Sequence, residues 1–228
     1  MHMKQHTVHL FDGELSHLHC LVLEMAGLVI DQLDRAMLSL DQANVAIAEG
    51  VVLRDREIND YELKIDAEVL TILAKRSPVA FDLRMVISIS KIVVDLERIG
   101  DETVKIAKLI MDMFDPQTSD PNPQLLRDIV KMGAMARSML RKAIDSFDTG
   151  KLENAYDLVD GDWNCDQEFQ DGIRRQLTFV IQDARLIGRA LEILQIMKAL
   201  ERCGDHCINI AEFMIFMVEG KDIRHQNR

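Results

Sequence analysis

The second half of this chain repeats the first, and this duplication constrains the fold more than any other feature. At an offset of 107 residues, the matches include Asp55 with Asp162. Beyond Pro78 the offset falls to 104, and the hexamers 96–101 and 200–205 agree at five of six positions. A frame that continues through three successive segments predicts two copies of one structural unit.

The apolar residues follow a helical period between breaks that proline and glycine mark. Ile89, Val93 and Leu96 are separated by three or four residues, as buried positions of a helix are. Proline costs about 3 kcal/mol inside a helix, and all four prolines lie outside the periodic segments. Gly50 and Gly150 mark two expected turns. The pattern predicts an all-α fold of six antiparallel helices over 13–48, 52–75, 79–113, 124–149, 152–182 and 185–219.

Each copy is expected to form one three-helix bundle. Pro116, Pro121 and Pro123 cluster near the midpoint of the chain, as in a linker. We therefore expect a first repeat over 1–115, a linker over 116–123 and a second repeat over 124–228, related by a pseudo-two-fold axis.

Composition narrows the functional classes. The formal net charge of −11 disfavours binding to nucleic acid phosphates. Four cysteines without a CxxC pair favour a reducing cytoplasm, and Cys203 and Cys207 are expected to be small buried residues. We expect no signal peptide and no membrane span, because no uninterrupted apolar run approaches the roughly 20 residues that a bilayer requires.

Pairs of acidic residues recur at a spacing of four. At this spacing two side chains lie about 40° apart around a helix and about 6 Å apart along it. One such pair is commonly only solvated, but acidic pairs that recur in the same register in both repeats indicate a helix face with a binding role. Oxygen ligands suit hard or borderline cations such as Mg²⁺, Mn²⁺, Ca²⁺ or iron. The candidate ligands are Asp55, Asn59, Glu97 and Asp101 in the first repeat and Asp162, Asp166, Glu201 and Asp205 in the second.

Residues next to these pairs refine the interpretation. Gly100 and Gly204 would each cost about 1 kcal/mol inside a helix, which close helix approach or room for a cation would explain. Arg98 and Arg202 are expected mainly to pair with neighbouring carboxylates. His206 lies about 100° from the acidic stripe and is not counted as a ligand.

Motifs for catalysis are missing from the sequence. It contains no Gly-rich phosphate loop, no G-x-S-x-G and no H-E-x-x-H. Without a nucleophile and a base in a recognisable arrangement, we expect no enzyme.

Several segments resemble the PhoU family of phosphate-uptake regulators. The duplicated hexamers 96–101 and 200–205 resemble the signature of that family, as does Ala74-Lys-Arg-Ser-Pro-Val-Ala-Phe-Asp-Leu-Arg84. The terminal segments 6–15 and 220–225 support the resemblance. It covers nearly the whole chain.

The resemblance implies a cytoplasmic, often dimeric protein of two three-helix bundles that represses the phosphate-starvation response. Its partners would be the ATPase subunit of a phosphate ABC transporter and the phosphate-sensing histidine kinase. Some members carry multinuclear metal clusters on paired acidic motifs, which implies iron, manganese, magnesium or zinc here. Asn59 departs from the acidic pattern.

Two alternatives stay open. A carboxylate-bridged di-iron protein of the ferritin kind would use Glu-x-x-His pairs, which the acidic stripes lack. The acidic motifs could also pair only with arginines and bind no metal. If they do bind metal, the second repeat should bind more tightly, because Asn59 and Lys105 lower the negative charge of the first repeat, whereas Asp166 and Asn209 occupy the matching positions.

Overall fold

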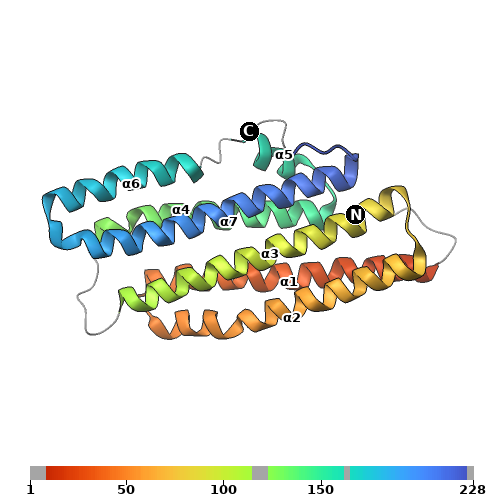
Figure 1. Ribbon diagram of the computed structural model, residues 1–228, viewed down its shortest axis with the longest axis horizontal. Coiled ribbons are helices and arrows are strands. Elements are labelled where there is room, and N and C mark those ends of the chain that lie inside the picture. The colour runs from red at the N-terminus through yellow and green to blue at the C-terminus, as the bar shows by residue number, and fades with distance from the viewer. Residues whose placement is uncertain (1–8, 115–122, 162–164, 225–228) are drawn as a thin grey trace.

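The computed structural model describes residues 9–114, 123–161 and 165–224. Those residues form helices and contain no β-strand, so the predicted all-α fold is confirmed. The helices are arranged along two layers (Figure 1). They are α1 (His9–Asp41), α2 (Val45–Arg76), α3 (Ala80–Met113), α4 (Pro123–Thr149), α5 (Glu153–Asp160), α6 (Cys165–Gln182), the 3₁₀ turn η1 (Ala184–Leu186) and α7 (Ile187–Glu219).

The two layers correspond to the two halves of the sequence. Helices α1, α2 and α3 pack on one another, and α7 packs on α4, α5 and α6. Helices α3 and α7 lie side by side at the centre and join the layers (Figure 1). The expected linker over 116–123 lies almost wholly outside the described residues, so the domain boundaries stay a prediction.

The first turn differs from the prediction. The first helix ends at Asp41 and not at 48, and α2 begins at Val45. Asn44 caps α2, because its side-chain Oδ1 accepts hydrogen bonds from the backbone N–H groups of Ala46 at 3.1 Å and Ile47 at 3.4 Å. Asparagine is among the preferred N-cap residues. Gly50, expected in the turn, therefore lies inside α2.

The predicted helix over 152–182 is two helices. Helix α5 ends at Gly161, whose backbone is extended, and α6 begins at Cys165. A glycine loses more backbone freedom than other residues in a helix, so it is a natural point for the break. The turn expected at Gly150 is confirmed, since its φ of 70° is the left-handed conformation of a helix C-terminal cap.

Aliphatic side chains and methionine fill the core. Leu18, Met25, Ile89, Met139 and Ile210 are examples of fully buried residues from four of the long helices. Helix α1 contributes much of this core, although the described residues include one stretch, Phe11–Asp41 in α1, that is long and apolar enough to cross a membrane. We had expected no stretch of this length and apolar character. Such a stretch is also typical of a helix that is buried in a protein core.

Candidate functional site

The acidic residues of the first repeat meet where α2 crosses α3 at Gly100. A Cβ atom added at Gly100 would lie 3.3 Å from Ile58 Cδ1 and 3.5 Å from Asp55 Oδ1. The missing side chain thus allows close helix approach, one of the two explanations expected for this glycine. Asp55 also accepts a hydrogen bond of 3.2 Å from Gln32 Nε2 of α1. The contact places Asp55 beside the acidic motif of α3.

Glu97 is the half-buried member of this cluster. Burial raises the pKa of its carboxyl above the ordinary value, and repulsion from Asp101, Glu62 and Asp55 adds to the shift. Burial and then repulsion from Asp66 and Asp101 likewise raise the pKa of Glu62. The carboxylates therefore share one electrostatic environment.

Glu62 was missed by the sequence analysis. It lies seven residues after Asp55, so two helical turns place it on the same stripe of α2. That spacing was one available signal, and the acidic pair that Glu62 forms with Asp66, four residues later, was another. The predicted Asn59 is exposed on the same helix.

Arg98 neutralises part of this charge. Its guanidinium lies 3.6 Å from the Glu97 carboxylate and 3.8 Å from that of Asp101. Both distances exceed a normal hydrogen bond, and the Arg98 side chain is well exposed, so these ion pairs are weak. The expected pairing of Arg98 with its neighbours is confirmed.

In the second repeat, Glu201 is the buried member. Its Oε atom pairs with Lys198 Nζ at 2.5 Å. Burial is the main cause of its raised pKa, to which repulsion from Asp205 and a hydrogen bond with Asp166 contribute. The structure thus brings together three predicted residues, Asp166, Glu201 and Asp205. The fourth, Asp162, lies outside the described residues.

The contacts of the two central glycines agree with the predicted internal register. A Cβ atom added at Gly204 would lie 3.1 Å from Cys165 Sγ. Cys165 stands 107 residues after Ile58, which makes the same contact with Gly100. Burial and the neighbouring carboxylates raise the pKa of the Cys165 thiol to about 11. This thiol is therefore protonated at neutral pH and behaves as a core side chain.

The donors suit a hard cation in chemical type but not in arrangement. Across the part of the chain that the structure describes, no group of three or more His, Cys, Asp or Glu side chains is placed to hold a metal ion. The ammonium of Lys198 and the guanidinium of Arg98 lie against the acidic pairs. A cation would have to displace them and draw the carboxylates together.

Two residues do not have the role expected of them in making the second repeat bind metal more tightly than the first. Lys105 Nζ donates to Glu102 Oε1 at 2.8 Å, and Asn209 Nδ2 donates to Asp95 Oδ1 at 3.0 Å. Lys105 is paired within α3 to a carboxylate that Arg202 of α7 also contacts, and Asn209 reaches from α7 to α3. Only the difference between Asn59 and Asp166 remains to favour the second repeat.

The joint between α3 and α7 carries its own polar network. His206 Nδ1 lies 2.8 Å from Asp95 Oδ1, and both groups are largely withdrawn from solvent. Arg202 donates to Glu102 across the same interface at 3.1 Å. The placement of His206 away from the acidic stripe is confirmed, as is ion pairing by Arg202.

Cys203 and Cys207 are fully buried free thiols, as expected. Burial raises the pKa of both thiols, which keeps them protonated. Both lie on α7 among the side chains of the hydrophobic core.

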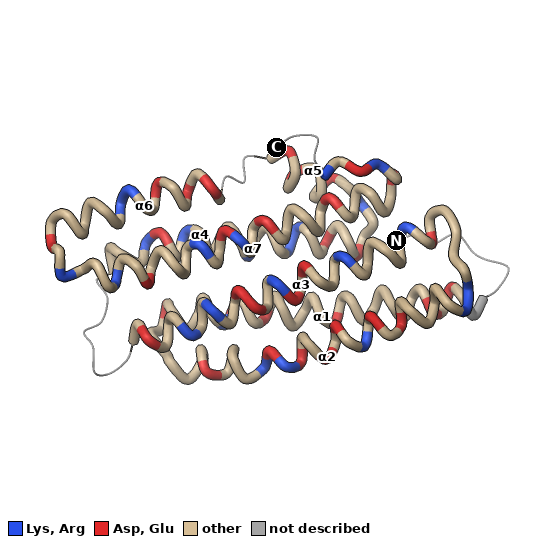
Figure 2. Tube along the Cα trace, in the orientation of Figure 1, with Lys and Arg blue, Asp and Glu red and all other residues tan. Residues whose placement is uncertain are grey.

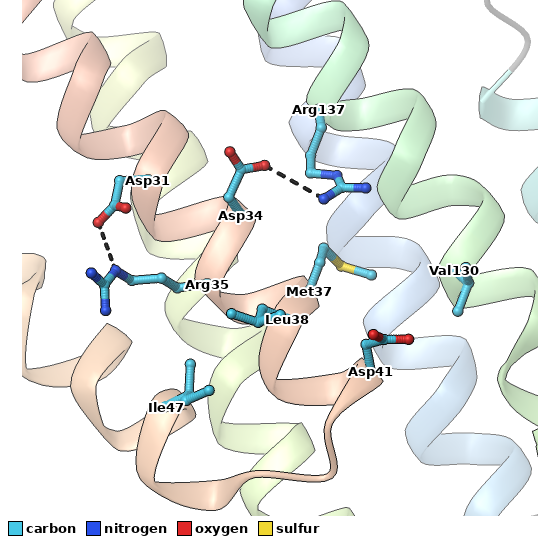
Figure 3. Close-up of a pocket in the computed structure, with 9 residues that line it drawn as sticks. All are labelled: Asp31, Asp34, Arg35, Met37, Leu38, Asp41, Ile47, Val130 and Arg137. Atoms are coloured by element: carbon cyan, nitrogen blue, oxygen red, sulfur yellow. Dashed lines mark hydrogen bonds and ion pairs between the residues drawn. The ribbon is translucent and has the colours of Figure 1, made fainter.

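A cavity of about 620 Å³ opens between α1 and α4 (Figure 3). Asp31, Asp34 and Asp41 line it together with Arg35 and Arg137. Arg35 pairs with Asp31 at 2.8 Å, and Arg137 lies 3.6 Å from Asp34. Because carboxylates outnumber the arginines, which are already paired with them, this cavity does not favour a phosphate anion.

Comparisons with known proteins agree with this architecture. The PhoU domain family model matches residues 22–110 and 129–214. The phosphate-specific transport system accessory protein PhoU homolog of Pseudomonas putida is 37% identical over 223 residues, covering 98% of this chain and 86% of that protein. The accessory protein PhoU of Escherichia coli (strain K12) is 33% identical over 225 residues, covering 99% of this chain and 92% of that protein.

Solved structures match as well. The crystal structure of PhoU from Pseudomonas aeruginosa has a TM-score of 0.87 at 37% identity, covering 92% of this chain and 100% of that one. The phosphate transport system regulatory protein PhoU from Streptococcus pneumoniae has a TM-score of 0.83 at 27% identity, with coverages of 93% and 99%. The two matched segments, the relatives and the helical architecture together establish that the chain belongs to the PhoU family.

Proposed function

We propose that this chain represses phosphate uptake and the phosphate-starvation response as a cytoplasmic adaptor. It would connect the ATPase subunit of a phosphate ABC transporter to the phosphate-sensing histidine kinase, and reach the membrane only through these partners. The observation that carries the proposal is similarity along nearly the whole chain to accessory proteins of phosphate transport.

Gene deletion tests this proposal directly. A strain without the gene should express a phosphate-starvation reporter in phosphate-rich medium, and a plasmid copy should restore repression. Co-purification of the ATPase subunit and of the kinase with the tagged chain would identify each partner separately. Normal repression in the deletion strain would remove the functional claim.

We further propose that the acidic faces bind divalent or multinuclear metal, with iron, manganese, magnesium or zinc as candidates. The acidic side chains that the structure brings together in each repeat support this, because carboxylate oxygens are ligands of hard and borderline cations. Elemental analysis of protein purified without chelators tests it. Oxygen consumption with added Fe²⁺ tests the di-iron alternative, and light scattering tests the homodimer that we also propose.

A further inference from the structure

Exposed aliphatic side chains continue the acidic stripe of α3 toward its N-terminus. Leu83, Ile87 and Val94 are exposed, and the steps from Leu83 through Ile87 and Val94 to Glu97 and Asp101 are four, seven, three and four residues. Residues at these spacings share one helix face. Apart from Ser90, which lies on the same stripe, this side of α3 is therefore apolar along its first half and acidic in its middle.

The neighbouring helix α2 widens this surface. Leu63 and Leu70 are each 68% exposed and lie seven residues apart. Leu63 follows Asn59 by four residues, so both leucines lie on the side of α2 that carries the candidate ligands. We call the surface formed by Leu63, Leu70, Leu83, Ile87, Glu97 and Asp101 the first hairpin face.

The second repeat has the same surface. On α7, exposed Ile187 and Leu191 precede Glu201 and Asp205 on one stripe. On α6, Leu177 and Ile181 are exposed, Ile181 by 84%, in a stretch from 176 to 182 without charged residues (Figure 2). We call the surface formed by Leu177, Ile181, Ile187, Leu191 and exposed Asp205 the second hairpin face; Glu201 beside it is buried and paired with Lys198.

The internal register aligns three of the four aliphatic positions of each face, whereas Leu63 aligns with Gln170 and Ile181 with Ala74. Leu70 aligns with Leu177 at the offset of 107, and at the offset of 104 Leu83 and Ile87 align with two further exposed aliphatic residues. A single exposed leucine needs no explanation. The same exposed positions, aliphatic in both copies although the surrounding sequence has diverged, indicate that each face is covered when the protein works.

We propose that each hairpin face binds an amphipathic helix of a partner protein. Aliphatic side chains of that helix would pack on the apolar end, and on a face that holds no metal its Lys or Arg side chains would meet the carboxylates at the other end. The proposal rests on the adaptor role above and specifies the surface that it uses. Recognition of a helix by a groove between two helices is a common mode of binding.

The length and the charge of the first hairpin face favour a basic amphipathic helix as the bound partner. Leu83 and Asp101 are 18 residues apart, which is about 27 Å along α3 and matches a partner helix of about 18 residues. Arg98 offsets only part of the charge of the first face, where Glu62 and Asp55 add to the acidic pair. A second copy of this chain would bring like charges together at a net charge of −11 per chain, so a basic helix is the better complement.

A synthetic probe tests the proposal on the full chain. The probe is a fluorescein-labelled 18-residue helical peptide with leucines at helical spacing in one half and lysines in the other. Calorimetry should show two peptides per chain, and 0.5 M salt should weaken the binding several-fold. A peptide with glutamates in place of the lysines should lose at least ten-fold in affinity.

Matched variants locate the sites. Leu83→Ser/Ile87→Ser should remove one binding event, and Leu177→Ser/Leu191→Ser should remove the other. Leu53→Ser is the control, because Leu53 is 72% exposed but lies about 80° around α2 from Leu63. Circular dichroism would confirm that each variant is folded.

Three results would overturn the proposal. These are equal binding by the wild type and both face variants, an equal loss in Leu53→Ser, and a wild-type dimer that dissociates when either face is changed. The last result would assign the faces to self-association. Repression in the deletion strain is a separate readout, so the adaptor role can fail or survive independently of the peptide result.

Discussion

Replacing His206 with alanine should destabilise the joint between the two repeats. The substitution removes one of two donors from Asp95, whose side chain is only 10% exposed; the other is Asn209 Nδ2 at 3.0 Å. Hydrogen bonds to charged groups contribute about 1.5–3 kcal/mol, and His206 is 23% exposed, so solvent compensates little. We expect a loss of about 2 kcal/mol in the free energy of unfolding, and a Tm lower by about 4–8 °C for a chain of this size.

A double-mutant cycle in urea, followed by circular dichroism, separates this pair from general damage. His206→Ala and Asp95→Ala together should cost less than the sum of the single variants by about 1 kcal/mol or more, because the second change removes the stranded carboxylate. Arg98→Ala is the control, with an expected change within about 0.5 kcal/mol since its ion pairs are long and exposed. Additive effects, or a loss below about 0.5 kcal/mol in His206→Ala, would refute the reasoning.

Three other substitutions test separate steps. Asn44→Ala should cost about 1 kcal/mol by removing the cap of α2, and an unchanged Tm would contradict that assignment. Burial and acidic neighbours raise the pKa of Glu97 in the folded protein, so the ionised carboxylate destabilises the fold above that pKa, and this cost vanishes below the unfolded-state pKa of about 4.3. Glu97→Gln should therefore raise the Tm at pH 7 but not at pH 4. A lower Tm at pH 7 would contradict this. Calorimetric Mn²⁺ titration should lose its tightest site in Glu201→Ala/Asp205→Ala and retain it in Glu97→Ala/Asp101→Ala; the reverse pattern would show that the second repeat is not the tighter one.

Duplication and helical periodicity were sufficient to predict the architecture. They located the turn at Pro78 and the end of α4 at Gly150, where a proline or a glycine marks the break. The turn before Asn44 was missed because the apolar period continues through it, and because Gly50 was a stronger apparent signal. Local cap chemistry, and not periodicity, decides where α1 ends.

The candidate site was predictable only along single helices. Spacing placed Glu97 and Asp101 on one face, and the duplicate motif did the same for α7. Spacing along one helix does not reveal which residue lies opposite on another. Lys105 and Asn209 therefore looked like neighbours of the acidic stripe, although Lys105 pairs with Glu102 of its own helix and Asn209 donates to Asp95 across the α3–α7 interface.

The two hairpin faces differ in their charges while they share three aliphatic positions. Asn59 aligns with Asp166, and exposed Val94 aligns with Lys198, which pairs with Glu201. The apolar ends can therefore supply similar affinity for any amphipathic helix, whereas the differing charges distinguish one helix from another, since charge complementarity contributes specificity more than affinity. On the proposed adaptor role, a duplicated scaffold with a similar apolar surface in each half and two distinct charge patterns would bind two different partners through the same mode.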